Sequence, residues 1–361
     1  MKALVADAPN KYSVQEVSLD EPKAGEVLID MKATGVCHSD LSIINGTLPV
    51  GLPMVVGHEG AGIVAAVGEG VTNVAPGDHV VLTWVAICGD CYFCHHEQPY
   101  LCSAGGLAQG KQLDGTSRVH RGDEALNVMT LLGCMAEKAV VPAISLVKID
   151  HDIPFAVAAM VGCGVMTGVG AAINTAQVKP GSTVAVFGCG GVGLSVIQGA
   201  VLSGAKSVIA VDLVDNKLEM ALKFGATHAF KGDKALEQIQ ELTRGIGVDY
   251  AFEAVGIPAL ILQANAATRR GGELVVVGVG SPTQTINLNA MLMSLTGKTY
   301  KGCFYGSANP AKDFPDLLDL YRAGKLNLDG MVTKTYSIDD AVTAIQDLEA
   351  GVNARGVIIY D

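Results

Sequence analysis

Residues Thr183 to Gly193 read TVAVFGCGGVG, an apolar run that passes directly into a glycine-rich turn. The apolar run predicts a strand over 183–187, and the residues from Gly193 to Leu202 suit a helix. Glycines between a strand and a helix allow a tight turn and let the backbone approach a pyrophosphate at the helix N-terminus. We therefore predict a dinucleotide site, and its turn residues are Gly188, Gly190, Gly191, Val192 and Gly193.

The alternation of apolar strands with helices continues after this turn. We predict strands over 207–211, 248–252 and 273–277 and a helix over 215–224. Continuous β-branched runs separated by helices are typical of a parallel sheet covered on both faces. Asp212 ends the strand that follows the glycine turn, where a carboxylate accepts hydrogen bonds from an adenosine ribose and repels a 2′-phosphate. The cofactor is therefore predicted to be NAD rather than NADP.

The two ends of the chain have a different pattern. Short alternating runs over 26–31, 62–67 and 78–82 are broken by glycine, which favours an antiparallel barrel or sandwich. The C-terminal part suits helices near 313–322 and 338–348 and a closing strand over 356–360. The sequence thus predicts an α/β protein with a β domain at residues 1–164 and 305–361. A nucleotide-binding domain at residues 165–304 interrupts it.

Charge and composition exclude several classes of partner. The 361 residues carry a net charge of −11 without a Lys/Arg block, which argues against nucleic acid or an anionic membrane. The segments 153–178 and 181–205 lack charge and are long enough to span a bilayer, but their Gly, Ala and amide content favours buried α/β structure. The start, Met1 to Val5, has no signal-peptide shape. We expect a soluble, cytoplasmic protein.

Four of the nine cysteines fall in one short run. Clustered cysteines in a chain without an export signal indicate metal rather than disulfides. Two successive CxxC steps and a fourth Cys supply enough thiolates to close a tetrahedral zinc site, so this zinc would be structural. His95 and His96 lie within the run and are interpreted as solvated loop residues. The predicted ligands are Cys88, Cys91, Cys94 and Cys102.

A second group of candidate ligands is dispersed along the chain. Cys37, His58 and Cys163 would give zinc three protein ligands and one open position, the arrangement of a catalytic site. Such a metal acts as a Lewis acid on one oxygen atom. A ligating His usually donates its other N–H to a carboxylate, for which Asp40 is a candidate. Spacing alone does not link these three segments.

With these three signals in this order, the chain resembles the zinc-containing medium-chain alcohol dehydrogenases, essentially from end to end. The resemblance implies a co-chaperonin-like β-barrel catalytic domain in which a doubly wound Rossmann domain is inserted. It also implies two zinc ions per chain, one catalytic and one structural, and NAD. Cys37, His58 and Cys163 would bind the catalytic zinc, and Glu59 would lie close behind it. The four clustered cysteines would bind the structural zinc.

The resemblance also implies roles for single residues. Ser39 matches the hydroxyl that takes the alcohol proton, and Trp84 a pocket residue that presses on the substrate. The liver-type members end the proton relay in a histidine where this chain has Ser42, so the proton would leave through water, the ribose hydroxyl or another base. Cys134 and Cys303 have no assigned role. For the cofactor, the resemblance implies that Asp212 and Lys217 contact the adenosine ribose. It implies that His38 and Arg355 contact the phosphates and that Thr167 lies near the nicotinamide.

The predicted function is hydride transfer between an alcohol and NAD to give an aldehyde or ketone and NADH. Primary alcohols with an aryl, allylic or linear chain are expected. One alternative is a thiol-dependent formaldehyde dehydrogenase acting on an S-hydroxymethyl adduct, because Leu113 to Arg118 resembles a segment of those members. Another is a catalytically silent scaffold. Thr285 to Leu288 resembles the strand through which family members pair, so a homodimer or homotetramer is expected.

Overall fold

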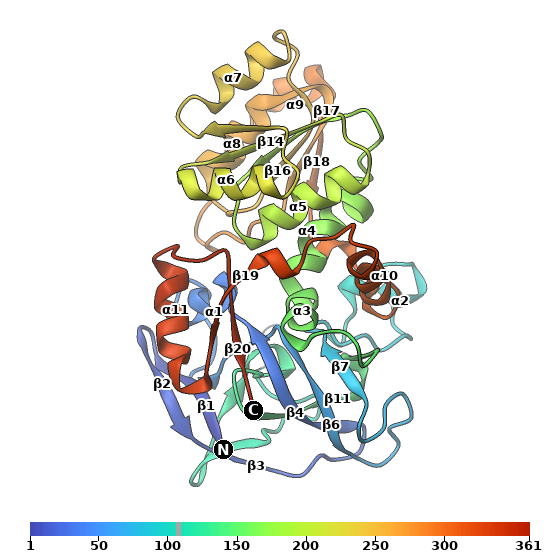
Figure 1. Ribbon diagram of the computed structural model, residues 1–361, viewed down its shortest axis with the longest axis vertical. Helices are drawn as coiled ribbons and strands as arrows, with labels where there is room; N and C mark the ends of the chain where they lie inside the picture. The colour runs from blue at the N-terminus through green and yellow to red at the C-terminus, as the bar shows by residue number, and fades with distance from the viewer. Residues whose placement is uncertain (106–109) are drawn as a thin grey trace. The chain divides into compact units, whose positions relative to one another are not determined.

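The computed structural model describes residues 1–105 and 110–361. The chain forms two compact units, residues 1–163 with 309–361 and residues 164–308 (Figure 1). The predicted fold class, an antiparallel β unit with a parallel α/β unit inserted in it, is confirmed. The domain limits that we expected from the sequence lay after residue 164 and before residue 305.

The first unit is built around one large sheet, whose strand order is β12-β7-β6-β4-β20-β19, with β11 paired to β4. The C-terminal strand β20 pairs antiparallel with β4, which brings the end of the chain back into the first unit. The strands of this sheet are β4 (Glu26–Gly35), β6 (Gly60–Val67), β7 (His79–Leu82), β11 (Lys138–Pro142), β12 (Leu146–Ile149), β19 (Val332–Tyr336) and β20 (Arg355–Ile359).

Two smaller sheets complete this unit. One has the order β10-β5-β1-β2 and the other β3-β8-β9. Their strands are β1 (Lys2–Ala8), β2 (Lys11–Glu16), β3 (Ser18–Leu19), β5 (Met54–Val55), β8 (Val119–Arg121), β9 (Glu124–Ala125) and β10 (Asn127–Val128). The α-helices of the unit are α1 (His38–Ile44), α2 (Tyr92–His95), α3 (Phe155–Met160), α10 (Pro310–Arg322) and α11 (Ala341–Glu349).

The second unit is a parallel sheet of six strands in the order β15-β14-β13-β16-β17-β18. Helices α5 and α6 contact β14, and α7 and α8 contact each other and the strands β15 and β16. The strands are β13 (Thr183–Phe187), β14 (Ser207–Asp212), β15 (His228–Lys231), β16 (Val248–Glu253), β17 (Thr268–Val276) and β18 (Thr299–Gly302). The helices are α4 (Met166–Gly170), α5 (Gly191–Leu202), α6 (Asp215–Lys223), α7 (Ala235–Leu242), α8 (Pro258–Ala267) and α9 (Ala290–Thr296).

Burial on both faces explains the continuous apolar strands of this sheet. Ala185 and Phe187 of β13 share a buried cluster with Ile239 of α7 and Ile261 of α8. The alternate residue Val186 is fully buried as well. Successive side chains of a strand point to opposite faces, so a strand covered on both faces needs an apolar residue at every position.

The helical stretch Phe155–Thr175 is long and apolar enough to cross a membrane by composition alone. Within the structure 83% of its apolar window is buried, as in a core helix. It contains two π-helical turns, η4 (Val161–Val165) and η5 (Ala171–Thr175). The other uncharged segment, residues 181–205, consists mainly of β13 and α5. The prediction that both segments are buried α/β structure is confirmed for this reason.

The segment Leu113 to Arg118 forms part of a buried ion network. Arg118 is 1% exposed and donates to both carboxylate oxygens of Glu26, at 2.8 and 2.6 Å, and to Asp114 at 2.8 Å. The hydrogen bonds from Thr116 and Arg118 lower the pKa of the Asp114 carboxyl. Glu26 also accepts the backbone N–H of Lys23. The segment thus ties the loop after the cysteine run to the start of β4.

We predict that Arg118→Met destabilises the protein by about 3–5 kcal/mol, because Glu26 would stay buried without its cation. The midpoint of thermal unfolding, followed by circular dichroism, measures the loss. Lys138→Met is the matched control, since its partner Asp30 lies on the same strand as Glu26 and both side chains are more than two-fifths exposed. That change should cost less than about 1 kcal/mol. Equal midpoints for the two variants would contradict the prediction.

Candidate metal and cofactor sites

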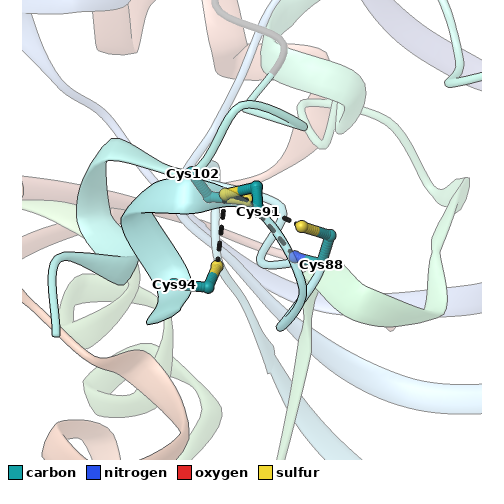
Figure 2. A group of neighbouring side chains, drawn as sticks. All are labelled: Cys88, Cys91, Cys94 and Cys102. Carbon is teal, nitrogen blue, oxygen red and sulfur yellow. Dashed lines mark hydrogen bonds between the residues drawn. The ribbon is translucent and has the colours of Figure 1, made fainter. Parts of the chain in front are cut away.

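The four cysteines of the short run meet around one point. Cys88, Cys91, Cys94 and Cys102 place their sulfur atoms within 4.8 Å of one another. Figure 2 shows these side chains turned toward a common centre from the loop around α2. Sulfur separations are 3.5 Å between Cys102 and Cys88, 3.6 Å between Cys91 and Cys94, and 3.8 Å between Cys91 and Cys102. None of these cysteines forms a disulfide.

These separations match a tetrahedral zinc site. With Zn–S bonds of about 2.3 Å, the corners of a sulfur tetrahedron lie about 3.8 Å apart. Backbone N–H groups of Ser103 and Cys94 lower the pKa of the Cys91 thiol to about 5. Burial and the neighbouring Cys91 raise the pKa of Cys94 to about 12, so a cation is needed to ionise the whole set. The donor set therefore fits a closed structural zinc.

The dispersed ligand candidates also meet, and all of them belong to the first unit. Cys37, His58, Glu59 and Cys163 are buried, with ligand atoms within 4.8 Å of one another. Apart from the Cys37 thiol of the same cluster, His58 Nε2 has no hydrogen-bond partner in the described part of the chain, and it is buried. Cys163 donates to Cys37 and thereby holds the pKa of the Cys37 thiol well below its usual range. A buried imidazole nitrogen that faces only thiols of the same cluster fits a zinc ion.

Asp40 holds two of these ligands in position. Its Oδ2 accepts the backbone N–H of Cys37 at 2.9 Å. Its Oδ1 lies 3.0 Å from His58 Nδ1 and accepts the backbone N–H of Gly57 at 3.1 Å. The expectation that Asp40 pairs with His58 is therefore confirmed. Since Nδ1 faces the carboxylate, Nε2 is the nitrogen left for the metal.

A π-helical turn supplies Cys163. The turn η4 packs so closely on β7 that a Cβ on Gly162 would lie 2.7 Å from the carbonyl oxygen of Leu82. Only glycine permits this approach, and the adjacent Cys163 thereby reaches the cluster. Trp84 is 8% exposed, and its indole N–H lies near enough to Cys163 to act against the rise in the pKa of that thiol. The structure thus places the predicted pocket residue beside a predicted ligand.

The other residues expected near the cluster are placed differently. Ser39 Oγ lies 3.9 Å from Cys37 Sγ, and both belong to the first turn of α1 or its N-cap. His38 is exposed at the start of α1. Arg355, expected on the pyrophosphate, is 4% exposed and forms an ion pair with Glu59. Its role toward the cofactor stays a prediction.

In the second unit the three spaced glycines of the dinucleotide turn differ in what the missing side chain permits. Gly188 has φ +94°, which the tight turn after β13 requires. A Cβ on Gly190 would meet nothing within 4 Å, so this face of the turn is open. A Cβ on Gly193 would collide with the carbonyl oxygen of Gly188, so this glycine sets how closely α5 packs on the turn. The helix begins at Gly191, two residues earlier than predicted.

Asp212 organises the turn from the next strand. Its Oδ2 accepts the backbone N–H of Cys189 at 2.8 Å, and its Oδ1 accepts those of Leu213 and Val214. Lys217 lies in α6, close enough for its charge to lower the pKa of Cys189, although burial raises that pKa overall to about 12. Thr167 lies in α4 and is 9% exposed. The open turn, with a carboxylate beside it, fits a dinucleotide.

Some residues that shape these sites escaped the sequence analysis. Gly57 has φ +99°, and a Cβ there would collide with the backbone of Met135. Gly162, next to Cys163, has no role in the prediction from the sequence. Glu253, a fully buried carboxylate, is the last residue of β16 and lies one residue beyond the strand predicted over 248–252. An acidic residue that ends an apolar strand was the signal available for Glu253.

Comparisons with known proteins identify the family of the chain. The family model for the alcohol dehydrogenase GroES-like domain matches residues 23–151, and that for zinc-binding dehydrogenases matches residues 191–323. The chain is 42% identical to the NDMA-dependent alcohol dehydrogenase of Amycolatopsis methanolica, over 99% of this chain and 98% of that protein. The chain belongs to the zinc-dependent medium-chain alcohol dehydrogenase family. The resemblance noted from its motifs, including the co-chaperonin-like domain, is confirmed.

Two further relatives bear on the activity. The S-(hydroxymethyl)glutathione dehydrogenase of Paracoccus denitrificans is 39% identical over 99% of both chains. The crystal structure of the benzyl alcohol dehydrogenase of Acinetobacter calcoaceticus superposes with a TM-score of 0.93 at 34% identity, over 100% of this chain and 99% of that chain. These relatives support an oxidoreductase of the alcohol dehydrogenase type.

We predict that Asp40→Asn weakens zinc binding at Cys37, His58 and Cys163 about 10- to 100-fold, because the amide no longer fixes the imidazole as an ionised carboxylate does. Metal analysis after dialysis against a chelator would then find the zinc of the four-cysteine cluster retained and the other lost. Asp30→Asn, on β4, is the control and should keep both ions. Retention of two tightly held ions by Asp40→Asn would refute the prediction.

Proposed function

We propose that the protein is an NAD-dependent alcohol dehydrogenase with one catalytic and one structural zinc. The observation that carries this proposal is the buried cluster of two thiols and an imidazole whose Nε2 has no partner outside the cluster, with the Ser39 hydroxyl 3.9 Å from Cys37 Sγ. Three nitrogen and sulfur ligands with an open fourth position are typical of catalytic zinc, whereas four thiolates make a structural site.

The residues around the cluster have separate tasks in this proposal. Zinc held by Cys37, His58 and Cys163 supplies Lewis acidity toward the oxygen atom of the alcohol. Ser39 accepts the proton of the alcohol hydroxyl, and this proton leaves through water, the ribose hydroxyl or another base, because Ser42 cannot act as a histidine does. Asp40 keeps the ligands in place, and Trp84 borders the substrate.

NAD is proposed as the hydride acceptor. The support is the glycine turn, open at Gly190, and the carboxylate of Asp212 beside it, which disfavours a 2′-phosphate. His38, Thr167, Lys217 and Arg355 are proposed as further contacts of the cofactor. The relative from Amycolatopsis methanolica is NDMA-dependent, so activity should be measured both with and without NDMA.

Primary alcohols with a flat side chain are the proposed substrates. The indole of Trp84 lies near enough to Cys163 to affect the pKa of its thiol, which puts a large flat residue next to a proposed zinc ligand. A solved relative is a benzyl alcohol dehydrogenase. Both observations favour aryl and allylic alcohols, with linear ones as the next class.

The second candidate is oxidation of an S-hydroxymethyl adduct of formaldehyde and a thiol. A relative at 39% identity is an S-(hydroxymethyl)glutathione dehydrogenase, which favours this candidate. The segment Leu113 to Arg118, which suggested the activity from the sequence, is occupied by the ion network with Glu26. The segment Leu113 to Arg118 therefore has a structural role, and the second candidate function rests on the similarity to this relative.

The decisive experiment follows NADH formation with a panel of alcohols, before and after zinc chelation. Benzyl alcohol, geraniol, a series from ethanol to octanol, and formaldehyde with and without glutathione form the panel. We expect zinc-dependent oxidation of the plain alcohols. Activity confined to formaldehyde plus thiol would establish the second candidate, and no turnover with or without NDMA would revive the scaffold hypothesis.

Cys37→Ser tests the ligand assignment within the same assay. We expect turnover to be abolished, because a hydroxyl is a poor ligand for zinc compared with a thiolate, while NADH binding measured by fluorescence is kept. Cys303→Ser, at a cysteine without an assigned role, should remain active. Full activity of Cys37→Ser would contradict the assignment of the catalytic zinc.

We also propose that the protein forms a homodimer through the region of α9. No residue of α9 is buried, and Met291 and Leu295 are 63% and 65% exposed. Residues 274–297 carry no charge in a chain whose net charge is −11, so contact between two copies here brings no like charges of this segment together. Exposed apolar surface of this extent favours association.

Leu295→Glu is predicted to shift this equilibrium toward monomers, because the carboxylate would be buried without a partner in the dimer. Sedimentation velocity across a concentration series measures the change. Leu242→Glu on α7, an exposed apolar position outside the region, should leave the dimer intact. A monomeric wild-type protein would refute the proposal.

A further inference from the structure

The strand order of the second unit reverses between β13 and β16. The chain runs outward through β14 and β15 on one side, and through β17 and β18 on the other. In such a sheet the loops at the carboxyl ends of the two central strands separate and leave a crevice for a ligand. Glu253 is the last residue of β16, in register with Phe187, the last residue of β13. A carboxylate therefore lies at the edge of this crevice.

Glu253 is fully buried, and its carboxylate is used by the backbone of the loop that follows it. It accepts the N–H groups of Val255 at 3.0 Å, of Gly256 at 2.8 and 3.0 Å, and of Ile257 at 3.4 Å. No ion pair with Lys, Arg or His is found for it within residues 1–105 and 110–361. Burial raises the pKa of this carboxyl against the lowering effect of the three N–H groups. A buried carboxylate costs folding free energy, so its hydrogen bonds to this loop indicate a specific role for the loop.

The loop that Glu253 holds packs tightly against its neighbours. A Cβ on Gly188, the first glycine of the dinucleotide turn, would collide with Cγ2 of Val255. A Cβ on Gly278, in the loop after β17, would collide with the backbone N of Gly256. The main-chain oxygen of Glu253 accepts the N–H groups of Val277 and Gly278. One residue thus joins the loops that follow β16 and β17, and sets how Val255 lies on the glycine turn.

We propose that Glu253 is a positioning residue for the dinucleotide, whose carboxylate fixes the loop 254–257 as a wall of the crevice beside Gly188. The inference rests on the proposed binding of NAD. Because the carboxylate takes the N–H groups of this loop, the loop offers the cofactor apolar surface, namely the exposed side chains of Val255 and Val279. A wall that is already ordered spares the entropy of ordering it when the cofactor binds.

The test is an NADH titration of the full-length, zinc-loaded protein, followed by fluorescence. Glu253→Gln keeps the size of the side chain but turns an N–H₂ group toward the N–H donors. We expect the Kd for NADH to rise about tenfold, because the loop loses one buried hydrogen-bond acceptor. The KM for NAD should rise in parallel while the KM for alcohol and the zinc content stay unchanged. A purely structural role would instead change both KM values together.

Glu273→Gln is the matched control. Glu273 lies in the neighbouring strand β17, away from its carboxyl end, and pairs with Lys301 at 3.1 Å. This variant should bind NADH as the wild-type protein does. Amide hydrogen exchange at Gly256 gives a second measurement, since the exchange should become faster in Glu253→Gln and remain unchanged in Glu273→Gln.

Val255→Ala decides the matter if Glu253→Gln does not fold. Its side chain is 44% exposed, and the change shortens both the apolar surface that the loop offers to the cofactor and the side chain that lies against Gly188. We expect an increase of about threefold in the Kd for NADH, because the variant buries less apolar surface when the cofactor binds. A wild-type protein that binds no NADH would overturn the proposed cofactor. Wild-type affinity in both Glu253→Gln and Val255→Ala would overturn this inference alone.

Discussion

The buried carboxylate of Asp40 ties together the segments from which the first unit builds its ligand cluster. It accepts backbone N–H groups from Cys37 and Gly57 and faces His58 Nδ1. The segments that carry these residues belong to α1 and to the chain before β6, which are joined only through the fold. Without this acceptor, three polar groups would be buried without partners, at a cost of several kcal/mol in total. The position of the imidazole, and with it the direction of Nε2, depends on this one group.

The same physical device recurs in the second unit. Glu253, like Asp40, is fully buried and accepts several backbone N–H groups, which in its case come from residues close to it in the chain. In both cases the carboxylate accepts backbone N–H groups that a short loop leaves without a partner in a helix or a sheet. A buried acceptor converts a loop into a rigid element, and rigid elements hold ligands more accurately than mobile ones.

Close backbone approach is the second constraint common to both units. Gly162 lets a π-helical turn contact β7 beside Leu82, and Gly193 lets α5 contact the turn at Gly188. At these positions the missing side chain brings a residue of a proposed site into place, Cys163 in one unit and the open face of Gly190 in the other. Glycine weakens helices elsewhere, so its use inside a helix here indicates that packing outweighs helix propensity.

The local motifs could be predicted from the sequence because the covalent chain itself sets their geometry. Four cysteines from Cys88 to Cys102 can meet within one loop, and a glycine turn between a strand and a helix has few conformations. The alternating patterns also predicted β13, β14, α6 and β16 nearly to their ends. They did not predict β15, β18 or the π-helical turns, where polar residues, short length or unusual hydrogen bonding hide the pattern.

The tertiary structure alone decided which distant residues meet. Cys37 and Cys163 lie far apart in the chain, and only the packing of η4 on β7 brings them into one cluster. Glu59 and Arg355 are joined because β20 returns to pair with β4. The sequence by itself determined the chemistry available at each site, since residue type and local spacing are covalent properties. Which groups share a site was decided by the pairing of distant strands and by the space left at a few glycines.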